Sequence, residues 1–88
     1  MKVSNMISSK GNKVANQFII DDGITIYFQS YNTIIAKKYH TTKEVYLDNN
    51  WDYYRTTRKY RNIFLHETKR ETERKIKSGV YIVANLNA

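Results

Sequence analysis

The chain has 88 residues, 41% of them hydrophobic and 26% charged, with a formal net charge of +7. These values predict one small folded domain spanning residues 1–88 and argue against wholesale disorder. The absence of cysteine excludes disulfides, cysteine-ligated metals and thiol nucleophiles, and neither a secretory signal nor an apolar run of the ~18 residues that a membrane span needs is visible.

The first half of the sequence predicts an antiparallel meander of four to five short strands. Residues 1–8 are expected to be loosely ordered or to form a short edge strand around residues 5–8. Strands are predicted at residues 14–20, 24–29, 33–38 and 44–47. In the second of these, Ile24, Ile26 and Phe28 are predicted to share the buried face of a half-buried strand, because they alternate with the polar or aromatic residues between them. The meander is either a curled open sheet or a partly open small barrel.

A first helix is predicted to begin near Arg58, after Thr56 or Thr57 as a possible N-cap. Tyr60, Ile63 and Phe64 are predicted to form its core face, because they fall at positions i, i+3 and i+4. With a length of about ten residues this helix is too short to be stable alone, so it must dock on the sheet.

A second helix is predicted at residues 69–78. Thr68 and Glu71 form a capping-box pattern at its start, and Gly79 occupies the position where a helix often ends in the left-handed conformation. Residues 80–86 then read as a closing strand. The order of strands, two short helices and a C-terminal strand predicts an α+β fold.

Positive charge is concentrated in the last third of the chain. Residues 1–54 carry a net charge of +1, whereas residues 55–88 carry +6 and all of the arginines. Arginine makes planar, bidentate contacts with phosphate or carboxylate, so this segment is a candidate anion- or nucleic-acid-binding surface; the alternative is a solvated face that keeps the protein soluble. The candidate cations are Arg55, Arg58, Lys59, Arg61, Lys69, Arg70, Arg74, Lys75 and Lys77.

Aromatic residues lie directly beside these cations. Trp51, Tyr53 and Tyr54 precede Arg55 almost without a gap, and bases stacked on such rings gain ~1–3 kcal/mol each. Trp51 could equally be a buried part of a small core. Eight tyrosines exceed what a small core accommodates with satisfied hydroxyls, so some are expected to be exposed.

The sequence offers little catalytic equipment. No metal-site motif occurs, no cofactor is indicated, and His40 and His66 read as loop and helix-end residues. An enzyme is therefore not expected. A small metal-independent ribonuclease remains an alternative, because Lys, Arg, Tyr and His together can cleave RNA.

Several short segments resemble a family of small uncharacterised proteins encoded by bacteriophages. The likeness covers about residues 8–86 and implies a phage origin and action in the cytoplasm of a bacterial host cell. It is carried by Ser9-Lys10-Gly11-Asn12-Lys13, Asn16-Gln17-Phe18, Tyr27-Phe28-Gln29-Ser30-Tyr31, Trp51-Asp52-Tyr53, Lys59-Tyr60-Arg61-Asn62 and Lys77-Ser78-Gly79.

Charge and resemblance together predict a small, basic, non-enzymatic binding protein. Its expected partner is nucleic acid or a host protein–nucleic-acid complex, as for an anti-CRISPR-like or other anti-defence inhibitor; an acidic protein surface is another option. The basic charge argues against mimicry of DNA, which requires acidic residues. Alternatives are a protein-only inhibitor or adaptor that uses exposed tyrosines, and a nucleotide-binding pocket. The sequence fixes neither the target nor the oligomeric state.

Overall fold

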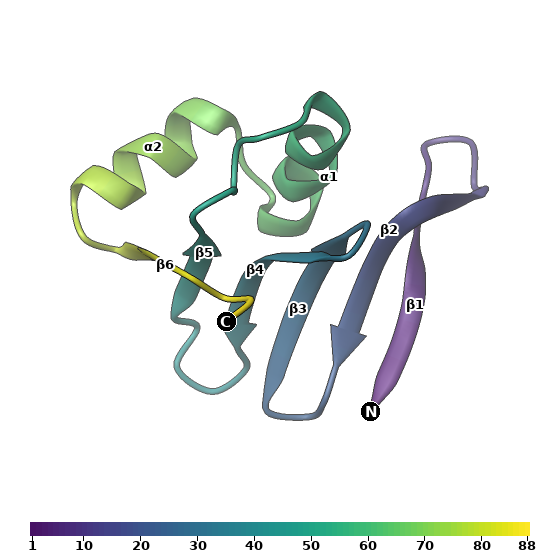
Figure 1. The fold of residues 1–88 in the computed structure, drawn as a ribbon, viewed down its shortest axis with the longest axis horizontal. Coiled ribbons are helices and arrows are strands. Elements are labelled where there is room, and N and C mark those ends of the chain that lie inside the picture. Colours follow the sequence, from purple (N-terminus) through teal and green to yellow (C-terminus); the bar gives the residue numbers. More distant parts are fainter.

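The computed structural model describes all 88 residues as one six-stranded sheet with two short helices (Figure 1). Five strands come first, then both helices, then the last strand. The elements are β1 (Lys2–Ile7), β2 (Lys13–Asp21), β3 (Thr25–Ser30), β4 (Thr33–Tyr39), β5 (Val45–Asp48), α1 (Arg55–Leu65), α2 (Lys69–Lys77) and β6 (Tyr81–Ala84). This is the predicted α+β arrangement.

The strands lie in the sheet in the order in which they occur in the chain. Neighbours from β1 to β5 are antiparallel, whereas β6 runs parallel to β5 because the two helices form a crossover between them. Strands β1 and β6 are the two edges of an open sheet. The prediction of a partly open barrel is therefore wrong. The first residues of the chain form an edge strand, which is one of the two alternatives predicted for them.

Strand β3 begins at Thr25, one residue later than the sequence pattern predicts. The carboxylate of Asp22 accepts hydrogen bonds from the main-chain N–H groups of Ile24 and Thr25, at 2.9 and 2.7 Å. This turn keeps Ile24 out of the strand and leaves it 72% exposed. The prediction that Ile24 lies on the buried face with Phe28 is thus wrong, because a local side-chain turn replaces the first strand position.

Helix α1 starts three residues earlier than predicted, and neither candidate threonine caps it. Tyr54 is the N-cap residue and offers no side-chain hydrogen bond to the helix. Thr57 is instead buried, with its hydroxyl 2.7 Å from that of Ser30 on β3. The hydroxyl that the sequence suggests for capping thus forms a tertiary hydrogen bond to the sheet instead. The buried face of α1 contains Thr57 and Arg61 and leaves Ile63 47% exposed, so the prediction that Ile63 lies on the core face is wrong.

Helix α2 follows its local sequence closely. Thr68 accepts from the main-chain N–H of Glu71, and the Glu71 carboxylate accepts from the main-chain N–H of Thr68, so the capping box is confirmed. Gly79 has φ +82°, in the left-handed region expected after the helix.

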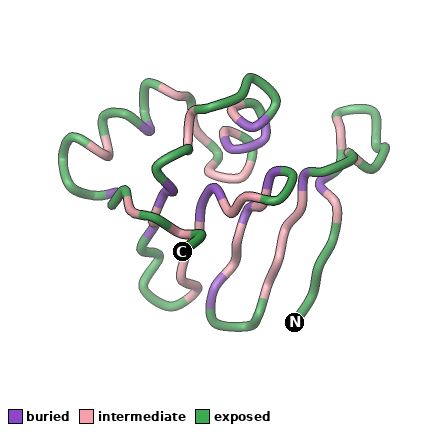
Figure 2. Tube along the Cα trace, viewed as in Figure 1, coloured by how far each residue is buried: buried purple, intermediate pink, exposed green.

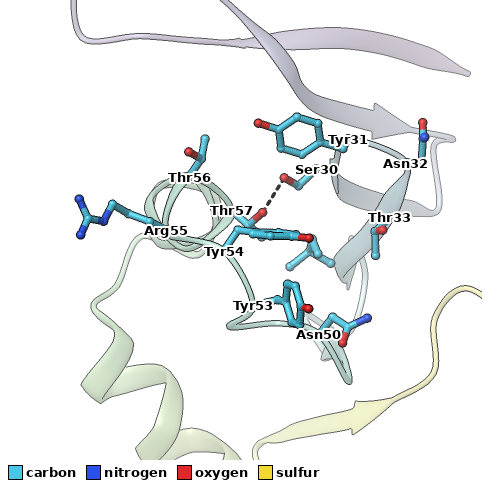
Figure 3. Close-up of a pocket in the computed structure, with 11 residues that line it drawn as sticks. Ser30, Tyr31, Asn32, Thr33, Asn50, Tyr53, Tyr54, Arg55, Thr56 and Thr57 are labelled. Carbon is cyan, nitrogen blue, oxygen red and sulfur yellow. Dashed lines mark hydrogen bonds between the residues drawn. The ribbon is translucent and has the colours of Figure 1, made fainter.

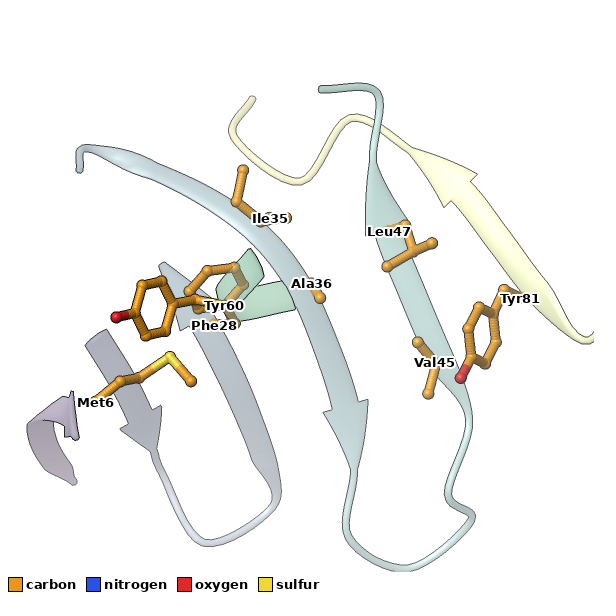
Figure 4. Close-up of a cluster of buried hydrophobic side chains, with 8 residues drawn as sticks. All are labelled: Met6, Phe28, Ile35, Ala36, Val45, Leu47, Tyr60 and Tyr81. Carbon is orange, nitrogen blue, oxygen red and sulfur yellow. The ribbon is translucent and has the colours of Figure 1, made fainter. Parts of the chain in front are cut away.

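The hydrophobic core lies between the sheet and helix α1 and continues to β6 (Figure 4). Phe28 of β3 and Phe64 of α1 stack with ring centroids 5.9 Å apart. Buried segments cluster where helix and sheet meet, whereas β1 and the outer turns are exposed (Figure 2). The buried apolar residues are Met6, Phe28, Ile35, Ala36, Val45, Leu47, Tyr60 and Tyr81.

Candidate functional site

One carboxylate, that of Asp52, engages three of the predicted surface cations. Its Oδ1 accepts from Nε of Arg58 at 2.8 Å and from Nη1 of Arg61 at 3.1 Å, and its Oδ2 lies 2.7 Å from Nζ of Lys69. Burial alone would raise the pKa of Asp52, but the hydrogen bonds from Lys69, Arg61 and Arg58 outweigh it and hold that pKa below its ordinary value. The cluster links α1 to the first residue of α2.

Arg61 does not belong to the surface at all. Its side chain is 0% exposed, and its guanidinium stacks over the Trp51 ring at 4.8 Å from the centroid. The remaining contacts of the guanidinium are to the main-chain oxygen of Trp51 and to the side chain of Asn62, both at 2.8 Å. The sequence-based assignment of Arg61 to a contact surface is therefore wrong, because Arg61 is an internal cation. Trp51 is half-buried and packs against the core, which is the second of the two alternatives given for it.

Lys75 is likewise paired within the protein. Its ammonium lies 2.9 Å from the carboxylate of Glu67, which also accepts hydrogen bonds from the hydroxyls of Thr72 and Tyr81. Burial alone would raise the pKa of Glu67, but these donors together hold it below its ordinary value. Burial, together with the hydrogen bond to Glu67, raises the pKa of Tyr81 to about 12. This cluster ties α2 to β6.

Five of the predicted cations remain exposed and form no ion pair. They occupy two stripes, one on α1 with a spacing of four residues and one along α2 at positions i, i+4 and i+7. Both helices lie along the same end of the sheet (Figure 1). We call these residues the free cations: Arg55, Lys59, Arg70, Arg74 and Lys77.

A pocket of about 730 Å³ opens beside the start of α1. Three tyrosines follow one another along it (Figure 3): Tyr31 from the turn between β3 and β4, then Tyr54 and Tyr53 from the segment before the helix. They are 47%, 59% and 67% exposed, respectively. The rings of Tyr53 and Tyr54 meet edge to face, with centroids 4.4 Å apart. We call them the pocket tyrosines.

The floor and the rim of the pocket are polar. The hydrogen-bonded hydroxyls of Ser30 and Thr57 line it, and Asn32 and Asn50 lie at its edge. Arg55 contributes to the wall, although its guanidinium points away from the tyrosine rings (Figure 3). Stacking surfaces beside hydroxyl and amide groups suit a flat, polar ligand.

Tyr31 has an unusual main-chain conformation for its residue type, with φ +56°. Two hydrogen bonds hold it there: its N–H donates to the main-chain oxygen of Asn16 at 2.7 Å, and its own oxygen accepts from Nε2 of Gln29 at 2.8 Å. Strain of this kind is retained where the surrounding structure fixes a side chain in place.

Sequence reasoning identified two of the pocket tyrosines and missed the third. Tyr53 and Tyr54 were found because they adjoin the cations in the chain, whereas Tyr31 is more than twenty residues away. The only local signal was the turn-forming segment Ser30-Tyr31-Asn32, in which a bulky residue stands where glycine or asparagine is usual.

These features define a small α+β protein with an open sheet, two cationic helices and a tyrosine-lined pocket at the start of α1. The chain belongs to a protein family of unknown function, DUF8033, whose model matches residues 1–79. No curated protein and no solved structure shows a significant match to it.

Two further findings concern the whole chain. Neither helix has the length and apolar character needed to span a membrane. No three His, Asp or Glu side chains are grouped so that they could hold a metal ion.

Proposed function

We propose that this protein is a small non-enzymatic binding protein whose partner is nucleic acid, either free or within a nucleic-acid-processing complex. The free cations of α1 and α2 would contact phosphates, and the pocket tyrosines would contact bases. The resemblance to phage-encoded proteins extends this proposal to a host defence or nucleic-acid-processing complex as the setting.

The observation that carries the proposal is the separation of the cations into two groups. Four cations are paired with carboxylates of the same chain, so their role is structural: Arg58, Arg61, Lys69 and Lys75. The free cations have no such partner, and one of them, Arg55, also lines the pocket that holds the exposed tyrosines. Unpaired cations together with exposed tyrosines on one small protein favour an anionic partner with flat groups.

The test measures how tightly the protein binds labelled single- and double-stranded oligonucleotides. Fluorescence anisotropy gives the affinity at each of a range of salt concentrations. Log affinity should fall linearly with log salt, by about 0.9 per phosphate contacted on duplex and about 0.7 on single strands. Reversal of Arg70, Arg74 and Lys77 to Glu should weaken binding to every sequence and lower the salt slope by about 1 for each contact removed.

A matched control separates a specific surface from net charge alone. Lys10, Lys13 and Lys43 are exposed and lie outside the helices, so reversing these three to Glu changes the net charge by the same amount. The proposal requires that this control variant bind much as the natural protein does. Equal losses in both variants, or a flat salt response, would refute a helical contact surface.

The pocket favours a second candidate, a nucleotide as a separate small ligand. Its volume lies within the range of about 300–1,000 Å³ that is usual for small-molecule sites. A panel of mononucleotides and cyclic dinucleotides, screened by thermal shift, would test this candidate directly.

A Tyr31→Asn variant distinguishes binding at the pocket from binding elsewhere. Asparagine tolerates the left-handed conformation of this turn, so the variant should be as stable as the natural protein or more so, yet lose affinity for a ligand that stacks on the Tyr31 ring. Unchanged affinity in this stable variant would show that the pocket is not used.

A further inference from the structure

One face of the sheet is left uncovered by the helices. Phe28 of β3 stacks on Phe64 of α1, and the hydroxyl of Ser30 is hydrogen-bonded to that of Thr57 on the same helix. These two β3 side chains therefore lie on the face that the helix covers. Alternation along the strand then places Tyr27 and Gln29 on the opposite face. Much of β2, β3 and β4 is accordingly only half-buried (Figure 2).

The strand register aligns one residue from each strand in a row across this uncovered face. Each member is the direct partner of the next in the pairing of neighbouring strands. We call it the sheet-face row: Val3, Ile20, Tyr27, Lys37, Tyr46 and Ile82. Its centre is two tyrosines flanking a lysine, and its ends are aliphatic.

The lysine is held between aromatic rings. The ammonium of Lys37 lies 5.1 Å from the ring centroid of Tyr46 and 5.4 Å from that of Tyr39, and these two rings meet edge to face at 5.9 Å. Phe18 adds a further ring on β2, since it is paired with Gln29 in the same face pattern. The face thus carries four aromatic residues on four adjacent strands, and two of them, Tyr39 and Tyr46, contact Lys37. Glu44 lies at the margin, in a long 3.5 Å contact with the Tyr46 hydroxyl.

We propose that this face is a platform for single-stranded nucleic acid, with unpaired bases stacked on Tyr27 and Tyr46 and a phosphate at Lys37. Strands lie about 4.8 Å apart, so these two rings, two strands apart, are spaced by about 10 Å and leave room for the lysine between them. Sheet faces with aromatic residues bind unpaired bases by stacking, because every base has a flat face. A duplex keeps its bases inside and could not use such a platform.

Charge complementarity selects this occupant over a second copy of the chain. Lys37 lies on the fourth of six strands, near the middle of the row. A symmetric face-to-face dimer would bring two such ammonium groups together while removing both from water, which is costly without a carboxylate partner. The net charge of +7 adds repulsion between copies and attraction for a polyanion.

This platform rests on the proposed function, which names nucleic acid as the partner. It adds the uncovered sheet face as a second binding surface and a preference for single strands. The experiment titrates the full chain with a labelled oligo-dT or oligo-U and with a duplex of the same length. Tyr27→Ala and Tyr46→Ala should each weaken single-strand binding by about 5- to 150-fold, the equivalent of one lost stacked base. Tyr46→Phe, which keeps the ring, should bind normally.

Urea unfolding of each variant verifies that the fold is retained, and amide chemical shifts during the titration locate the contact independently of any mutation. The inference predicts shifts on β2 to β5 along the sheet-face row and a monomeric free protein. It is overturned if the shifts are confined to the helices and the tyrosine variants bind normally.

The outcomes also separate this inference from the proposed function. If the variant with Arg70, Arg74 and Lys77 reversed loses binding while the sheet variants keep it, the proposed function survives and the platform does not. If the natural protein binds no oligonucleotide, both fail. A dimer that Tyr46→Ala dissociates would instead show that a second copy covers the face, which overturns the platform.

Discussion

Replacement of Asp52 by Asn should remove a large part of the stability of this protein. The substitution keeps the size of the side chain but abolishes the charge that faces Arg58, Arg61 and Lys69. The largest effect comes from Arg61, because its side chain is 0% exposed and cannot turn to water for compensation.

The magnitude follows from the exposure of the three cations. Removing the partner of a buried charge costs about 3–5 kcal/mol. Arg58 and Lys69 are 42% and 41% exposed, so solvent screening limits each of their pairs to ~1 kcal/mol or less. Against a total of about 5–15 kcal/mol for a small domain, a loss near 4 kcal/mol should lower Tm by at least about 15 °C, at 4–8 °C per kcal/mol.

Urea unfolding followed by circular dichroism measures this loss. A double variant, Asp52→Asn with Arg61→Met, should recover part of it, since the uncompensated buried charge is then gone. Glu73→Gln is the control, because Glu73 is exposed and forms no ion pair. A loss below about 1 kcal/mol for Asp52→Asn would refute the view that Arg61 depends on this carboxylate.

Three further predictions concern stability. His66→Gly should stabilise the protein by up to about 1 kcal/mol in urea unfolding, because His66 ends α1 at φ +56°, where glycine is unstrained; a destabilised variant would contradict this. Gln17→Met should stabilise it by about 1–3 kcal/mol, since Gln17 is 0% exposed and neither of its amide atoms has a partner, and a lower midpoint would show that the amide is needed. Because the pKa values of Asp52 and Glu67 are lowered in the folded state, their stabilisation is complete above the ordinary carboxyl pKa of about 4 and should be lost as the pH falls through the lowered values; Glu67→Gln should flatten that acid limb, and an unchanged limb would count against the cluster.

Local sequence rules were enough for most of the secondary structure. The turn at Asp22-Gly23, the capping box of Thr68 and Glu71, and Gly79 after α2 each act within a few residues, so their geometry is set by the chain around them. The strand patterns predicted the meander for the same reason. Local patterns do not determine whether the sheet closes into a barrel, because closure depends on how strands far apart in the chain meet.

The fate of each charge could not be read from the sequence. Arg61 and Arg70 look alike in the chain, yet Arg61 is buried on Asp52 and Trp51 whereas Arg70 is exposed and unpaired. Distance along the chain is no guide here, since Glu67 reaches Tyr81 on another element. Only packing decides which cations find carboxylates, because burial and partner geometry determine the cost of each charge.

For the tyrosines too, sequence and tertiary structure determine different properties. The sequence determined that eight tyrosines are too many for a small core, and hence that some must be exposed. Tertiary structure decided which ones: the left-handed turn brings Tyr31 to the pocket, and the strand register places Tyr27 and Tyr46 on either side of Lys37. Composition fixes how much aromatic surface a chain carries, but the faces on which it gathers are set by contacts between distant segments.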